Sequence, residues 1–164
     1  MKRILIFFTI TLSLPIFAQQ EYTFCIDGGG TKTILQVIDQ QGNVLPLTKN
    51  GVESDTAITS GSNFNSVGFE GLQRVFRDLF DGTHIKINDV EQPISTIFSR
   101  AQVIGGFAGF SKNGAFYQKV LEQNGFSPDQ IKVMEDADLA LELIDKDGAI
   151  LISGTGSICL GKKR

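Results

Sequence analysis

The sequence predicts an α/β domain on a mixed sheet, with antiparallel strands first and parallel strands later. Two apolar runs, residues 22–26 and 34–38, flank a glycine-rich turn, which is the pattern of a β-hairpin. From residue 101 onward, strand-like runs alternate with helix-like segments, which favours parallel strands joined by crossover helices. We therefore expect helices on both faces of the sheet.

Length and composition fit a globular protein. A chain of 164 residues, 41% hydrophobic and 20% charged, can bury a core, and its 13 Phe and no Trp predict a phenylalanine-rich one. The formal net charge is −3 and the chain has no basic stripe or arginine cluster, so we expect no nucleic-acid partner. Cys25 and Cys159 lie in separate predicted strands and are expected to be small buried apolar residues rather than a disulfide.

The first glycine-rich turn has the composition of a phosphate-binding loop. Its three glycines follow Asp27; they leave backbone N–H groups uncovered and can take positive φ, so an anion can lie against the main chain. Asp27 at the strand end can hold a hydrated Mg²⁺. Thr31, Lys32 and Thr33 offer donors to phosphate oxygens. An ordinary hairpin with a glycine-rich turn explains the same residues.

A second turn of small residues favours the phosphate interpretation. Residues 149–152 form an apolar run before Ser153, and another apolar run, residues 158–160, follows Ser157. Between them lie Gly154, Thr155 and Gly156. Two such turns in one chain predict two loops that hold one polyphosphate from opposite sides.

Together these turns resemble the phosphate motifs of the sugar kinase, actin and heat-shock ATPase superfamily. Within it, the sequence is most similar to the N-acetylglucosamine kinase and BadF/BadG/BcrA/BcrD ATPase group. The resemblance continues in order through residues 61–63, 106–109 and 135–137, and covers about residues 22–162. It implies a ribonuclease H-like, actin-like ATPase domain, with three antiparallel N-terminal strands, over residues 21–150. Residues 151–164 would then be the first hairpin of a truncated second domain.

The resemblance also implies a reaction, the transfer of the ATP γ-phosphoryl group to a hydroxyl of an amino sugar such as N-acetylglucosamine, with ATP and Mg²⁺ as cofactors. The implied ATP phosphate-binding residues are Gly29, Gly30, Thr31, Lys32, Thr33, Gly154, Thr155 and Gly156. The implied sugar-binding residues are Asn63, Gly106, Ala108, Gly109, Asp136, Gly154 and Thr155. Asp27 would hold Mg²⁺ through water, and Asp136 would take the proton from the sugar hydroxyl.

Local structure alone can account for several of these motifs. Asn63 or Ser62 can simply cap the helix that apolar spacing predicts after it. Glycines at 105–109 can admit a neighbouring element instead of a ligand. Asp136 can cap the helix that follows strand 131–134, although the carboxyl ends of strands are also where α/β sheets bind ligands.

The remaining elements are predicted from turn residues and periodicity. Residues 44–47 are expected to form a third, edge strand, and residues 48–61 a polar loop. Residues 81–100 show only a helix after Pro93. Ser111 is expected to cap the helix that ends near residue 124, and Glu135 and Asp138 are expected to be solvated.

The first 20 residues have the layout of a secretory signal peptide or hydrophobic leader. Lys2 and Arg3 precede an apolar run that ends near Pro15, and Ala18 suits the position before a cleavage site. The run is shorter than the roughly 20 residues that span a bilayer, so no stable membrane span is expected. Export conflicts with the use of ATP, which predicts the cytoplasm, and both locations stay open.

Three functions stay open. The first is an N-acetylglucosamine kinase-like protein, truncated and with little or no activity alone. The second is a BadF-type activator ATPase, against which the lack of clustered cysteines counts. The third is an exported, non-catalytic remnant of the fold. A second copy of the chain, or another chain that completes the fold, stays open as a partner beside the small-molecule sugar.

Overall fold

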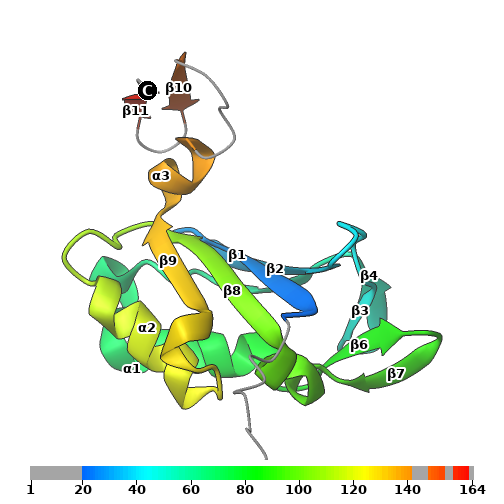
Figure 1. Ribbon diagram of the computed structural model, residues 1–164. Coiled ribbons are helices and arrows are strands. Elements are labelled where there is room, and N and C mark those ends of the chain that lie inside the picture. Colours follow the sequence, from blue (N-terminus) through cyan, green and yellow to red (C-terminus); the bar gives the residue numbers. More distant parts are fainter. Residues whose placement is uncertain (1–19, 142–147, 154–156, 163–164) are drawn as a thin grey trace, which may run out of the picture.

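A five-stranded mixed sheet organises the fold in the computed structural model, which describes residues 20–141, 148–153 and 157–162 (Figure 1). The strand order is β5-β2-β1-β8-β9. The pairs β1–β2 and β2–β5 are antiparallel, whereas β1–β8 and β8–β9 are parallel, which confirms the predicted mixed sheet. The strands are β1 (Tyr22–Gly28), β2 (Lys32–Asp39), β5 (Ala57–Ser60), β8 (Ala101–Phe107) and β9 (Ile131–Glu135).

Alternation of side chains explains why β1 and β2 form strands. Successive residues of a strand point to opposite faces, so every second residue of β1 can be buried. Phe24 and Ile26 are fully or almost fully buried, and Val37 and Leu35 stand directly opposite them in the antiparallel register. Asp27 points to the other face and is exposed at the end of β1.

Helices cover both faces of the sheet. The longer pair, α1 (Phe64–Phe80) and α2 (Gly114–Gln123), lie side by side on one face, as Figure 1 shows. Leu72, Phe76 and Leu79 of α1 are buried at the predicted spacing of three and four residues. The short α3 (Asp136–Leu141) follows β9 and packs against the other face, where a side chain on Gly106 would lie 2.8 Å from Leu139.

A second antiparallel sheet lies beside the first (Figure 1). Its order is β4-β3-β6-β7, and its strands are β4 (Val52–Ser54), β3 (Leu47–Lys49), β6 (Thr83–Ile87) and β7 (Val90–Pro93). The predicted third strand at residues 44–47 is therefore wrong: Val44 only bridges Ile38, and Leu47 begins β3. The third antiparallel strand of the main sheet is β5, inside the predicted loop.

Short helical and hairpin segments complete the described chain. The 3₁₀ helix η1 (Ile94–Arg100) confirms the predicted helix after Pro93, and a second 3₁₀ helix, η2 (Pro128–Gln130), precedes β9. Strands β10 (Gly148–Ser153) and β11 (Ser157–Lys162) pair antiparallel, as predicted, and the hairpin contacts α3. In Figure 1 this hairpin lies beyond α3, off the end of the sheet where β8 and β9 terminate.

The centre of the core is a group of phenylalanines, which the composition predicts. Phe24 of β1 makes edge contacts with Phe80, Phe98 and Phe126, at ring-centroid distances of 6.3, 5.6 and 5.3 Å. Phe98 and Phe126 stack at 4.4 Å. These rings come from β1, α1, η1 and the segment before η2, so one cluster joins the sheet to its covering elements.

The sequence predicts an N-terminal leader and no stable membrane span. The predicted leader, residues 1–20, lies almost entirely outside the described residues. Over the described ranges, helices fall short of the length and hydropathy that a membrane span requires.

Candidate functional site

The predicted site residues of the first domain gather where β1, β8 and β9 end. Because these strands are parallel, their carboxyl ends lie at one edge of the sheet. In the register, Asp27 stands beside Gly106, and Gly106 beside Met134. The segments that follow these strands, together with the start of α1, therefore form one continuous surface.

Backbone contacts tie this surface together. The amide of Ala108 donates to the carbonyl oxygen of Gly28 (2.8 Å), and the amide of Ser62 donates to that of Gly29 (3.0 Å). A side chain on Gly61 would overlap the carbonyl group of Gly30, so these two backbones lie against each other. The turn after β1, the start of α1 and the loop after β8 are thus held in contact.

The glycine-rich turn contains two backbone amides that donate to no described residue. The amide of Gly29 is used inside the turn, where it donates to the carbonyl oxygen of Lys32 (2.9 Å). The amides of Gly30 and Thr31 donate to no described residue, and both residues are exposed. A side chain on Gly30 would meet nothing within 4 Å, which leaves room for an anion.

These three glycines are able to take positive φ, but none of them does so in the structure. Gly28 is required for packing instead, because a side chain there would overlap the Phe107 ring and the Ser62 hydroxyl. The Ser62 hydroxyl is fully buried and has no hydrogen-bond partner among the described residues.

The hydroxyl-bearing and basic residues of the turn divide into two kinds. Thr31 and Lys32 are exposed and free to contact a ligand. Thr33 is fully buried, and its hydroxyl donates to the carbonyl oxygen of Ser60 (2.8 Å). Thr33 therefore joins β2 to β5 in this structure, and its predicted phosphate contact stays a prediction without geometric support.

Asn63 caps α1 and also lies against the loop after β8. Its side-chain oxygen accepts a hydrogen bond from the amide of Asn65 (3.0 Å), which confirms the capping interpretation. Gly109 has a φ of 80° and lies so close that an added side chain would be 2.6 Å from the Asn63 oxygen. The structure thus brings Asn63 and Gly109 together, as the sugar-binding prediction requires.

The structure corrects the predictions made for Ser111 and Glu135. Ser111 does not cap α2, whose N-cap position is Asn113. The amide and the hydroxyl of Ser111 instead donate to the Glu135 carboxylate, at 2.7 and 2.8 Å. Glu135 is therefore hydrogen-bonded rather than simply solvated, and it fixes the loop after β8 to the end of β9.

Asp136 begins α3 at the carboxyl end of β9 and is exposed. One of its carboxylate oxygens accepts a hydrogen bond from the amide of Ala137 (2.8 Å). Its backbone lies against β8, since a side chain on Gly106 would be 3.1 Å from the Asp136 Cα atom. Asp136 thus lies beside Gly106, as predicted, with its carboxylate open to solvent.

Tyr117 is a site residue that sequence reasoning missed. It is fully buried and stacks on Phe107, with ring centroids 4.5 Å apart. Its hydroxyl accepts a hydrogen bond from the amide of Phe64 (3.0 Å) and lies within donor distance of the Ser62 (2.8 Å) and Ala108 (3.1 Å) carbonyl oxygens. In the sequence it shares the apolar face of α2, so its pattern indicates an ordinary core residue.

The second predicted phosphate turn falls between β10 and β11. Its three residues, Gly154, Thr155 and Gly156, lie outside the described residues. That they approach the first turn stays a prediction.

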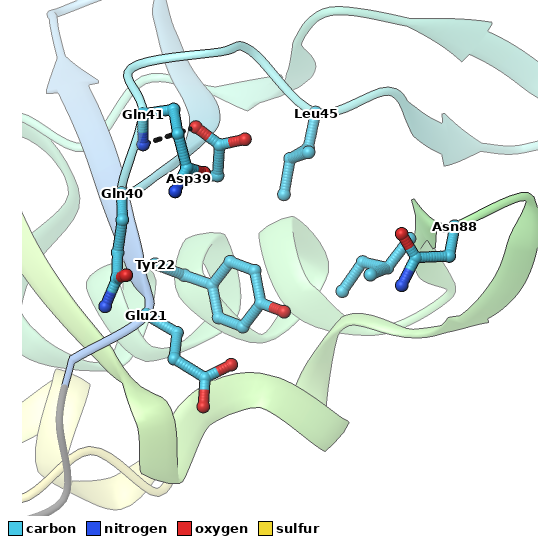
Figure 2. Close-up of a pocket in the computed structure, with 8 residues that line it drawn as sticks. Glu21, Tyr22, Asp39, Gln40, Gln41, Leu45 and Asn88 are labelled. Atoms are coloured by element: carbon cyan, nitrogen blue, oxygen red, sulfur yellow. Dashed lines mark hydrogen bonds between the residues drawn. The ribbon is translucent and has the colours of Figure 1, made fainter.

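A separate hollow of about 310 Å³ lies at the opposite end of β1 (Figure 2). Glu21 and Tyr22 line it from the start of β1, and Asp39 lines it from the end of β2. The Asp39 carboxylate accepts hydrogen bonds from the Gln41 amide (2.9 Å) and from the amide and side chain of Asn43 (2.8 and 2.9 Å). These bonds, that of the Asn43 side chain most of all, lower the pKa of Asp39.

The lowered pKa of Asp39 predicts a pH-dependent effect of Asp39→Asn. A group with a lowered folded-state pKa stabilises the protein above its unfolded pKa, and this contribution is lost as the pH falls through the folded pKa. We expect the variant to have a lower Tm than wild type at pH 7 and a smaller difference near pH 3. Thermal unfolding followed by circular dichroism at both pH values measures this. An equal difference at both pH values would contradict it.

Comparisons with known proteins give one curated relative and one likeness in fold. No protein-family model matches the chain, that of the BadF group included. The N-acetylmuramic acid/N-acetylglucosamine kinase of Clostridium acetobutylicum is 29% identical over 148 residues, which are 88% of this chain and 43% of that protein.

Among solved structures, a candidate N-acetylglucosamine kinase from Chromobacterium violaceum aligns with a TM-score of 0.58 at 18% identity, covering 86% of this chain and 45% of that one. The PPX-GPPA enzyme of Aquifex aeolicus aligns with a TM-score of 0.38 at 12% identity, covering 87% and 48%.

The likeness to the Chromobacterium violaceum structure concerns the fold. Together with the strand order β5-β2-β1-β8-β9, it confirms the predicted ribonuclease H-like fold. The chain spans less than half the length of the curated relative and of the solved structure that it matches.

Proposed function

We propose that the chain forms the phosphate- and sugar-binding part of an ATP-dependent kinase that acts on an amino sugar of the N-acetylglucosamine type. The observation that carries this proposal is the pair of amides at Gly30 and Thr31 that donate to no described residue, on the same sheet edge as the exposed residues Asp27 and Asp136. The Clostridium acetobutylicum relative is named as a kinase of such sugars. Since the chain covers 43% of that relative, the complete reaction is part of the proposal.

The residues of the first turn fit the phosphates of ATP. Uncovered amides and an ammonium group are donors that phosphate oxygens accept, and here Gly30, Thr31 and Lys32 supply them from one exposed turn. ATP and Mg²⁺ supply the transferable phosphoryl group and the neutralisation of its charge. In this proposal Gly29 shapes the turn, and Gly154, Thr155 and Gly156 approach the phosphates from the second domain that begins at residue 151.

Asp27 fits a hydrated Mg²⁺. Magnesium keeps several waters in nucleotide sites and takes only one or two carboxylates from the protein. Asp27 is exposed beside the turn, and the part of the chain that the structure describes holds no cluster of three or more His, Cys, Asp or Glu side chains. Asp27 would therefore hold the ion through water.

The loop after β8 and the start of α1 fit the sugar. Asn63 lies against Gly109, and Asp136 lies against Gly106, so all the described residues predicted to bind sugar line one surface with Ala108. The Asn63 amide nitrogen can donate to a sugar hydroxyl, and the Asp136 carboxylate can accept the proton that this hydroxyl loses.

Binding measurements test the proposal. The purified chain, labelled with ¹⁵N, is titrated with Mg-ATP and separately with N-acetylglucosamine. We expect Mg-ATP to shift the amide signals of Gly30 and Thr31, and the sugar to shift those of Asn63 and Gly109. Saturable shifts at the hollow of Figure 2 instead, or no shift at all, would contradict the proposal. Release of ADP that depends on the sugar separates a kinase from an activator ATPase.

A further inference from the structure

The two sugar-facing segments, residues 62–64 and 108–109, both contact the hydroxyl of Tyr117. The Tyr117 hydroxyl accepts from the Phe64 amide (3.0 Å), and its single proton can be donated to, or shared between, the carbonyl oxygens of Ser62 (2.8 Å) and Ala108 (3.1 Å). Asn63 lies between the first two of these partners, and Gly109 follows the third. One side chain from α2 therefore contacts the backbone on both sides of Asn63 and next to Gly109.

The first turn of α1 depends on such contacts, because the rest of the helix does not hold it. Gly68 has non-helical angles, with φ 64° and ψ −174°, so residues 64–67 form one turn that is separated from the body of α1. The Asn63 carbonyl accepts from both Ser66 (2.9 Å) and Val67 (3.1 Å) and closes this turn on itself. Tyr117 and the bond from Ser62 to Gly29 provide its backbone hydrogen bonds to the rest of the fold, and the Phe64 ring adds a stacking contact with Phe116.

Two other side-chain hydrogen bonds near these segments come from Asn113, one part-buried and one exposed. The Asn113 side chain donates to the Gly109 carbonyl (3.0 Å) and to the Asn65 side chain (3.3 Å). Asn65 is exposed, so water competes for this bond. Tyr117 is fully buried, where hydrogen bonds are stronger and an unpaired group is costly.

The hydroxyl keeps its proton at neutral pH. Burial raises the pKa of Tyr117 above its ordinary value; the hydrogen bond from Phe64 opposes this, and the nearby Glu135 and Asp136 carboxylates add to it. Tyr117 can thus donate to a carbonyl oxygen throughout the range in which a kinase works.

We propose that Tyr117 is a positioning residue that holds Asn63 and Gly109 in a fixed position relative to each other. It affects sugar binding without contacting the sugar. The sugar as ligand rests on the proposed function, whereas the coupling of the two segments rests on the hydrogen bonds alone. Loss of the hydroxyl should therefore loosen both segments and weaken binding of the sugar. It should leave the phosphate turn after β1 intact.

The test compares Tyr117→Phe with Val120→Ala. Val120 is also fully buried in α2 and has no contact with the Tyr117 hydroxyl among the described hydrogen bonds, so its truncation controls for lost stability. Native-state hydrogen exchange is measured on both variants and on wild type, at the amides of Ser62 and Ala108. Neither amide bonds to Tyr117, since they donate to the carbonyls of Gly29 and Gly28.

In Tyr117→Phe we expect both amides to exchange at least about fivefold faster relative to the amides of β1 and β2, the change that corresponds to one buried hydrogen bond. In Val120→Ala we expect all these amides to change together. If exchange in Tyr117→Phe were faster only at the Phe64 amide, or equally faster at all amides, the hydroxyl would not couple the two segments.

Ligand binding provides the second measurement. We expect Tyr117→Phe to raise the Kd of N-acetylglucosamine at least about fivefold and to leave that of Mg-ATP within about twofold. An unchanged sugar Kd would overturn the positioning role. If wild type itself binds no sugar, the proposed function fails, while the exchange experiment still decides whether Tyr117 couples the two segments.

Discussion

Asp136→Asn is expected to slow sugar-dependent ADP release by about 10²-fold or more, the usual contribution of a general base. The substitution keeps the shape and the hydrogen bond to the Ala137 amide, but it removes the carboxylate that would accept the sugar proton. Because Asp136 is exposed and follows β9, which β8 separates from β1, we expect the Kd of Mg-ATP to stay within about twofold. ADP release at high protein concentration, followed over hours, measures the effect.

Asp138→Asn is the matched control for this prediction. Asp138 is also exposed and lies two positions further along α3, so the variant removes the same charge from the same short helix. We expect it to release ADP at nearly the wild-type rate. Equal losses in the two variants would indicate a general effect of negative charge near the site and would rule out Asp136 as the base.

Phe24→Ala is expected to lower the free energy of unfolding by about 3–5 kcal/mol, the usual cost of removing a buried aromatic ring. Phe24 is fully buried in the central strand, and its ring meets Phe80, Phe98 and Phe126. Its removal leaves a cavity where the sheet, α1 and η1 meet, and these elements cannot all move to fill it. Urea denaturation followed by circular dichroism measures the loss.

Phe116→Ala serves as the control for ring removal. Phe116 stacks on Phe64, with centroids 4.7 Å apart, but 39% of it is exposed. Folding removes less apolar area of Phe116 from water, so we expect the free energy of unfolding to fall by about 1 kcal/mol. Similar losses in both variants would mean that the phenylalanine cluster around Phe24 is not the centre of the core.

Local patterns predicted the elements that carry the site. The glycine-rich turn between β1 and β2, the cap of α1 at Asn63 and the start of α3 at Asp136 all follow from residues that are neighbours in sequence. By contrast, β5 has four residues of which one is buried, so it shows neither a clear alternation nor an apolar run. The β6–β7 hairpin also escaped prediction: β7 is mostly exposed and has no such pattern, and the alternation of β6 extends over only five residues.

Contacts between distant residues could not be predicted from such patterns. Ser111 looks like a helix cap because serine before a helical segment usually is one, and only the fold brings Glu135 within reach of it. Tyr117 looks like a core residue, and its hydroxyl acquires a role only because residues 62–64 and 108 fold over it. Among the glycines of the site, Gly109 is the one with a positive φ, and the Asn63 side chain leaves no space there for a larger residue.

The central position of β1 also has a consequence for synthesis of the chain. Its antiparallel partner β2 follows directly, so this hairpin can form as soon as both strands leave the ribosome. Its parallel partner β8 comes much later, since Tyr22 pairs with Ala101, and until then one edge of β1 has no partner. The glycine-rich turn is therefore expected to form early in the nascent chain, and the loop that faces it only when β8 has been made.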